Sequence, residues 1–95
     1  MFNTLIEWIE KKSNKFSKSS INIEFNGKEH DNKYTVVFSM NGKMASIELL
    51  VTGITDLLIM DSGSEKIIFS ETVENLTEED LINTLNVFYD KLVNL

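Results

Sequence analysis

The dipeptide Asn41-Gly42, set between two runs of alternating apolar residues, constrains the fold of this chain more than any other feature. Asn-Gly is the strongest short signal for a two-residue β-hairpin turn, because both central residues of that turn adopt positive φ. A two-residue loop also fixes the register of its strands. The facing pairs are then Phe38 with Ala45, Val36 with Ile47, and Tyr34 with Leu49. All six residues are apolar, so the turn and the pattern predict the same hairpin with one buried face.

The hydrophobic spacing predicts two helices and three further strands around this hairpin. Apolar residues recur at helical spacing over 2–9 and again over 81–92, where Thr77 is placed to cap the second helix. Ile21, Ile23 and Phe25 alternate with polar residues and predict a first strand, while the wholly polar segment 27–33 predicts an exposed loop. The last two strands are expected at 54–60 and 66–72.

This order of elements predicts an α+β fold in one domain, residues 1–95. We expect an N-terminal helix, an antiparallel meander of about five strands and a C-terminal helix, with both helices on one face of the sheet. The facing of strand 54–60 stays open. A two-residue turn at Thr52-Gly53 points Asp56, Leu58 and Met60 toward the helices, whereas one extra turn residue points Leu57 and Ile59 there. The alternation assigns most aromatic residues to the core but leaves Phe16 unexplained.

The charge of the chain is unevenly distributed. Residues 34–95 carry ten acids and three lysines, a balance of −7, whereas residues 1–33 have a balance of +1. The chain contains no arginine, and its one basic run, within 11–18, is typical of a solvated helix face. Nucleic acid is therefore not expected as a direct ligand, because phosphate binding needs clustered basic side chains. An acidic stretch of this kind favours a positively charged partner.

Few residues in the sequence could support catalysis. There is no cysteine and one histidine, in Glu29-His30-Asp31, where neighbouring side chains do not converge on one point by default. We expect no enzymatic activity and no cofactor or metal, although a ligand-binding or enzymatic site at these three residues stays a hypothesis. The first ten residues lack the pattern of a secretory signal, and no apolar run reaches the ~20 residues that span a bilayer. We therefore expect a soluble, cytoplasmic protein without a membrane partner.

The acidic residues are the candidate partner-binding site. Three of them, Glu78, Glu79 and Asp80, are also explained by the favourable interaction of negative charge with a helix N-terminus. The others lie on the predicted strands and turns, where an acidic surface would steer a basic partner. If they prove scattered over different faces, their charge serves solubility alone. The candidates are Glu48, Asp56, Asp61, Glu65, Glu71, Glu74, Glu78 and Glu79.

The segment 43–61 resembles the centre of the TriTu-type immunity proteins of contact-dependent growth inhibition and related polymorphic toxin systems. Members of that family have a strand ending in a Gly turn, then an Asp-bearing strand, a second Gly turn and a C-terminal helix. Gly53, Asp56, Asp61 and Gly63 occupy such positions here, and segment 76–88 is similar to the closing helix of the family. The chain departs from the pattern at Leu50, where the family often carries tryptophan.

The resemblance implies an inhibitor that binds a cognate toxin and protects the producing cell. The toxin expected for this family is a nuclease domain that cleaves transfer RNA and can work with elongation factor Tu. An RNA-cleaving domain presents a basic surface, which the acidic residues listed above would complement. The alternative we keep is a small acidic secretion or assembly chaperone, which would bind an unfolded segment through exposed apolar surface and commonly dimerise.

Overall fold

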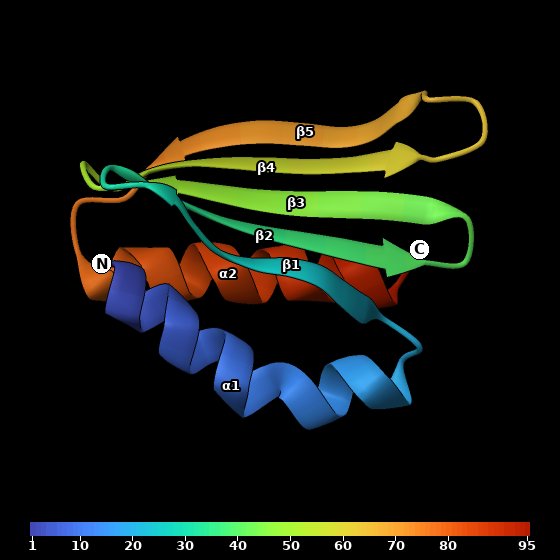
Figure 1. Cartoon of the computed structure of the whole chain (residues 1–95), viewed down its shortest axis with the longest axis horizontal. Coiled ribbons are helices and arrows are strands. Elements are labelled where there is room, and N and C mark those ends of the chain that lie inside the picture. The colour runs from blue at the N-terminus through green and yellow to red at the C-terminus, as the bar shows by residue number, and fades with distance from the viewer.

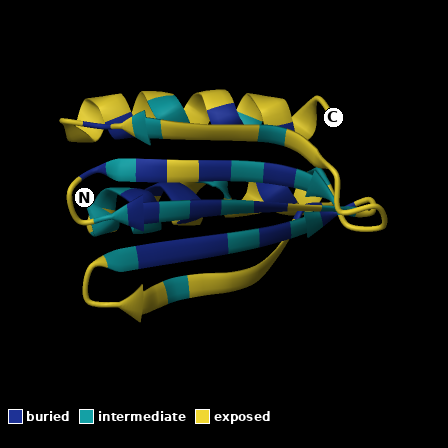
Figure 2. Cartoon of the chain, turned by 90° about the horizontal axis from the view of Figure 1, so that it is seen from above, coloured by how far each residue is buried: buried dark blue, intermediate teal, exposed yellow.

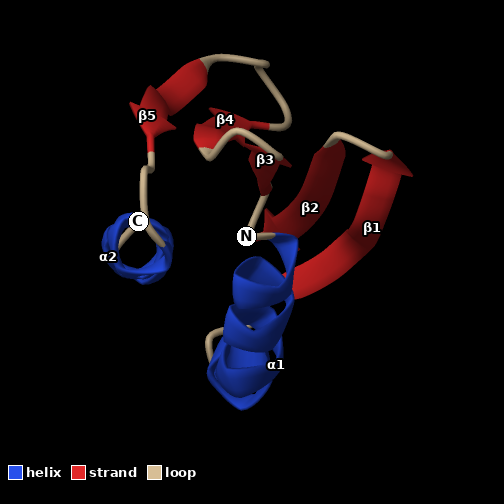
Figure 3. Cartoon of the chain, turned by 90° about the vertical axis from the view of Figure 1, so that its left-hand side faces the viewer, coloured by secondary structure: helices blue, strands red, loops and turns tan.

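The computed structural model describes all 95 residues, and it confirms the α+β meander expected from the sequence (Figure 1). The five strands form one antiparallel sheet in the order β1-β2-β3-β4-β5. Both helices lie on the same side of this sheet, which arches over them (Figure 3). No helix is long and apolar enough to cross a membrane. The elements are α1 (Phe2–Lys18), β1 (Asn22–His30), β2 (Lys33–Met40), β3 (Lys43–Leu50), β4 (Ile54–Asp61), β5 (Ile67–Glu74) and α2 (Glu78–Val93).

The central hairpin has the predicted register. Phe38 pairs with Ala45, Val36 with Ile47, and Tyr34 with Leu49. Asn41 and Gly42 have φ values of 43° and 75°, as the primed hairpin turn requires. The turn residues therefore place all six apolar side chains on the face that the helices cover.

The open question of the facing of β4 is settled by a three-residue turn at 51–53. Leu57 and Ile59 point toward the helices and are 4% and 0% exposed, while Asp56 points to the opposite side and is exposed. The turn depends on Gly53, which has a φ of +94°. Its N–H donates to the carbonyl of Leu50, and its carbonyl accepts from the N–H of Asn75. A Cβ atom there would lie 2.0 Å from the carbonyl oxygen of Asn75, so no other residue fits without movement.

Asn75 ties this turn to α2 through a buried polar network. Its side chain is 1% exposed; it donates to the hydroxyl of Thr55 at 2.9 Å and accepts from the hydroxyl of Thr84 at 2.8 Å. Because Thr55 lies on the covered face, this network supplies partners to polar groups that would otherwise be buried without them.

The first strand differs from the sequence prediction in two ways. Segment 27–33 is not a loop, because β1 continues to His30 and only Asp31 and Asn32 form the turn to β2. Irregularities in the pairing at Glu24 and Glu29 also break the alternation expected for Ile23 and Phe25. Ile23 pairs with Phe38 and Phe25 with Val37, so these two apolar residues lie on opposite faces. The period-two pattern alone could not reveal these bulges.

The core lies between the covered face and the helices, and Phe16 is at its centre. Phe16 is 1% exposed, and its ring lies 5.2 Å from that of Phe38, 5.6 Å from Tyr89 and 5.9 Å from Trp8. The residue that the helical stripe did not explain thus joins both helices to the sheet, because α1 extends to Lys18. The buried residues concentrate in the central strands, while β1 and β5 are mostly exposed (Figure 2).

Candidate functional site

The face of the sheet opposite the helices, called the uncovered face below, carries the candidate site. Register places alternate residues of all five strands on it. One row crosses the sheet through directly opposed residues: Gly27 with Thr35, Thr35 with Glu48, Glu48 with Asp56, and Asp56 with Thr72. Directly opposed residues of antiparallel strands have side chains on the same face, so this row forms one continuous polar band.

Glu48 and Asp56 are the two predicted site residues that the structure brings into direct apposition. They occupy facing positions on β3 and β4, where Cβ atoms are about 4.5–5.5 Å apart and like charges repel. Asp56 accepts a hydrogen bond of 2.6 Å from the hydroxyl of Thr72. Glu74 lies on the same face, opposite Ile54. Three of the eight candidates thus share the uncovered face.

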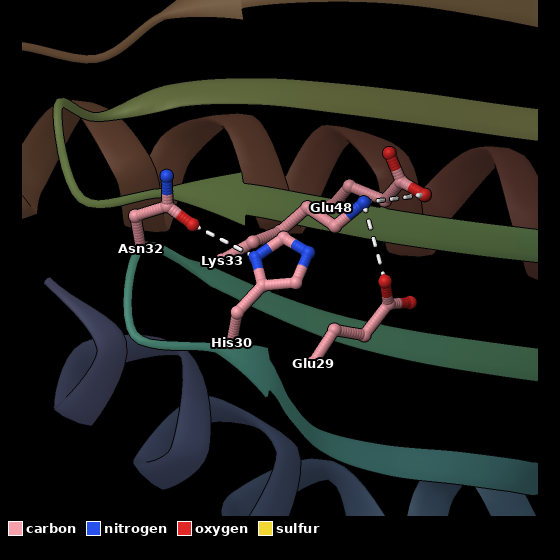
Figure 4. Close-up of polar contacts among 5 residues, drawn as sticks. All are labelled: Glu29, His30, Asn32, Lys33 and Glu48. Carbon is pink, nitrogen blue, oxygen red and sulfur yellow. Dashed lines mark hydrogen bonds and ion pairs between the residues drawn. The ribbon is translucent and has the colours of Figure 1, made fainter.

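Lys33 supplies the only basic group that is ion-paired in the structure. Its Nζ lies 3.3 Å from Glu29 Oε2 and 3.7 Å from Glu48 Oε1, so one ammonium is shared by two carboxylates (Figure 4). The hydrogen bond to Glu29 raises the pKa of Lys33. Since no cation of the chain pairs with Asp56, the band keeps an excess of negative charge.

Thr35, in the same band, is a buried residue whose hydroxyl oxygen accepts no hydrogen bond. It is 3% exposed, and its Oγ1 is the one buried side-chain polar atom that lacks a hydrogen bond. Its hydroxyl lies close enough to Glu29 to lower the pKa of that carboxyl, ahead of the contribution from Lys33. Even where the proton of Thr35 is directed at Glu29, the lone pairs of the oxygen remain free to accept.

Apolar side chains surround one side of the band and line a hollow of about 250 Å³. Val37, Met44, Leu58 and Met60 line this hollow together with Thr35 and Glu48. Met44 is 40% exposed and the other three apolar side chains are half-buried. A second hollow of about 210 Å³ shares Ser46, Glu48 and Leu58 with the first and extends to Asp56 and Thr72. The two hollows adjoin and are together called the trough below; its first part is mainly apolar but also includes Glu29, and its second part adds Asp56.

The other five candidates lie elsewhere. Asp61 and Glu65 flank the β4–β5 turn, where the amide of Gly63 donates to the Asp61 carboxylate and lowers its pKa. Glu71 is on the helix side of the edge strand β5, because it pairs with Leu57. Glu78 and Glu79 occupy the first turn of α2, which Thr77 caps as predicted, and Glu78 accepts from Thr4 at 2.9 Å. These five acids are dispersed, so the eight residues do not form one surface. By the criterion stated for scattered acids, the charge of these five serves the fold or solubility, and only Glu48, Asp56 and Glu74 remain as partner-binding candidates on one face.

The sequence-based list of partner-binding residues contains neither Glu29 nor Thr35. Both lie on the uncovered face. The polar composition of segment 27–33 predicts a loop around Glu29, and Thr35 is one of several polar residues in the predicted hairpin. The signal available for Thr35 was its position, since the register of the Asn41-Gly42 hairpin places it opposite Glu48. Nothing in the sequence indicates that its hydroxyl is buried.

Glu29, His30 and Asp31 do not converge on a common point. His30 Nδ1 lies 2.8 Å from the side-chain oxygen of Asn32, whereas Glu29 turns to Lys33 (Figure 4). No group of three or more histidine and acidic side chains is arranged to hold a metal ion.

Comparison of the chain with protein-family models, curated proteins and solved structures finds no match.

Proposed function

We propose that this chain is an immunity protein that binds a cognate bacterial toxin domain and neutralises it by stoichiometric binding. The toxin would be an RNA-cleaving nuclease with a basic surface, and elongation factor Tu could be a further partner through the toxin. The immunity protein would act in the cytoplasm of the producing cell. Its docking surface would be the uncovered face of the sheet.

The observation that carries this proposal is the opposition of Glu48 and Asp56 beside exposed apolar side chains. Like charges placed opposite each other cost stability, and Lys33 offsets this repulsion at Glu48 while no cation of the chain offsets it at Asp56. A basic partner removes that repulsion when it binds, while Met44 and its apolar neighbours supply contact area. The resemblance of segment 43–61 to immunity proteins points in the same direction.

The direct test is co-expression with the product of the gene immediately upstream of this one. The neighbour expressed alone should stop growth, and this chain should restore it. A neighbour that is not toxic, or growth that stays arrested, contradicts the proposal.

Charge-matched variants locate the docking face. Glu48→Gln combined with Asp56→Asn should weaken toxin binding by about tenfold or more, because two charge-assisted contacts are lost. The control is Glu7→Gln combined with Asp90→Asn, which changes the net charge equally on the helices and should leave binding intact. Equal losses in both double variants would assign the effect to net charge and exclude the uncovered face as the specific dock.

The chaperone alternative rests on a different surface. A groove of about 230 Å³ between the edge strand β5 and helix α2 is lined by Phe69, Val73, Val87 and Phe88 together with Glu71. An edge strand beside an apolar groove can accept an extended peptide. Light scattering separates the two functions, because the chaperone hypothesis expects a stable dimer. A Val87→Asp variant that loses function while the Glu48/Asp56 variant retains it would favour the chaperone.

A further inference from the structure

The trough on the uncovered face contains a like-charge pair that the chain neutralises only in part, at Glu48. Glu48 and Asp56 are directly opposed. Of these two, only Glu48 has a cation nearby: Lys33 Nζ lies 3.7 Å from it and closer still, at 3.3 Å, to Glu29. Asp56 is bonded to the Thr72 hydroxyl and to no cation. An external cation between the two carboxylates would remove their repulsion.

Thr35 provides a second and independent indication of a ligand. Its Oγ1 is buried and accepts no hydrogen bond, since the Glu29 carboxylate beside it can only take the hydroxyl proton. The residue is the register neighbour of Glu48 and lines the first hollow. A donor that enters this hollow would meet an unsatisfied acceptor beside a carboxylate.

The shape of the trough defines the side chain that would enter it. Its first part, lined by the apolar Val37, Met44, Leu58 and Met60, suits an aliphatic stem, and its second part, which adds Asp56, suits a cationic head. The acceptors are spread across three strands, from Thr35 on β2 to Asp56 on β4. A planar guanidinium with five fixed donors can bridge acceptors that are separated in this way, whereas an ammonium is a compact point charge.

We propose that Thr35, Glu48 and Asp56 form a subsite for one arginine side chain of the protein partner. The stem of the arginine lies over Met44 and Leu58, and its guanidinium bridges Glu48 and Asp56 and donates to the Thr35 hydroxyl. This inference rests on the proposed docking function and names the group that the uncovered face recognises. The arginine of the partner supplies the positive charge that no cation of this chain supplies at Asp56.

The test is an NMR titration of the ¹⁵N-labelled full chain with the peptide acetyl-Gly-Arg-Gly-amide. Lysine and citrulline peptides of the same length are measured alongside it. A single side chain should bind weakly, on the order of millimolar. We expect amide shifts around Thr35, Glu48 and Asp56, with affinity falling from arginine to lysine to citrulline. A lysine peptide that binds as well as arginine, or a citrulline peptide that binds equally, overturns the assignment.

Variants separate recognition from folding. Thr35→Val keeps the shape of the side chain and removes only the hydroxyl, so the fold should persist while arginine binding weakens about threefold or more. Asp56→Asn should weaken it about tenfold, and Glu7→Gln should have no effect. Unchanged binding in Thr35→Val and Asp56→Asn, or shifts spread over α2, contradicts the subsite. The titration contains no toxin, so it tests the subsite separately from the proposed function. Arginine binding in the titration without rescue of growth in the co-expression test would refute the proposed function and leave the subsite standing.

Discussion

The two faces of the sheet are built from alternate residues of the same strands, but they have opposite chemistry. On the covered face, Val36, Ile47 and Leu57 are buried and pack against the helices. On the uncovered face, the adjacent positions hold Val37, Glu48 and Asp56, which are half-buried or exposed. Residues next to each other in the sequence thus serve the core and the surface in turn.

The comparison shows which polar groups the fold needs. The covered face satisfies its buried polar groups through Asn75, which bonds to both Thr55 and Thr84. The uncovered face instead leaves the Thr35 hydroxyl oxygen without a donor and two carboxylates opposed. A surface that lacks such internal partners is suited to receive them from another molecule.

The largest effect is expected when the covered face loses an aromatic side chain. Phe38→Ala should lower the free energy of unfolding by about 3–5 kcal/mol, because Phe38 is 0% exposed and packs on Phe16. Urea denaturation measures the change. The control on the uncovered face, Met44→Ala, should cost about 1 kcal/mol or less. Comparable losses in the two variants would mean that the faces do not differ in packing.

The next effect concerns the turn that decides which residues of β4 reach each face. Gly53→Ala introduces a left-handed alanine, at about 1–2 kcal/mol, and a clash with the Asn75 carbonyl, at about 1–3 kcal/mol. We expect a clear fall in the urea midpoint. Gly63→Ala is the matched control, since its nearest heavy atom is 3.5 Å away and its φ is not positive. A small effect at Gly53 would show that this turn can rearrange.

The elements whose structure is local were predictable from the sequence. Asn41-Gly42 determines a turn and a register by itself, and the Thr77 cap acts within four residues. The facing of β4 was not predictable, because the turn at Gly53 depends on Asn75, which is distant in the sequence. The bulges of β1 were likewise not predictable, because they lie at Glu24 and Glu29, whereas the one glycine of the strand, Gly27, is regularly paired.

The candidate site was predictable only in part. Glu48 and Asp56 were among the acids selected by charge, but their apposition depends on the same β3–β4 turn. Had this turn contained two residues, Asp56 would have faced the helices. Thr35 became a candidate only when its burial was known, since composition and spacing do not distinguish a buried threonine from an exposed one.

The smallest effect on stability is expected for Asp56→Asn, and its sign is opposite to that of the other variants. Asparagine keeps an acceptor for the Thr72 hydroxyl and removes the repulsion from Glu48, so the free energy of unfolding should rise by about 0.2–1 kcal/mol. Urea denaturation in 20 mM and 1 M NaCl measures it. The gain should shrink in 1 M salt, where the screening length is about 3 Å. Asp90→Asn on α2, which faces no acid across a strand, should show no gain.

Lower stability of Asp56→Asn at low salt would mean that the carboxylate serves the fold rather than a partner. A variant that is more stable yet binds less well is the behaviour expected of a residue kept for recognition.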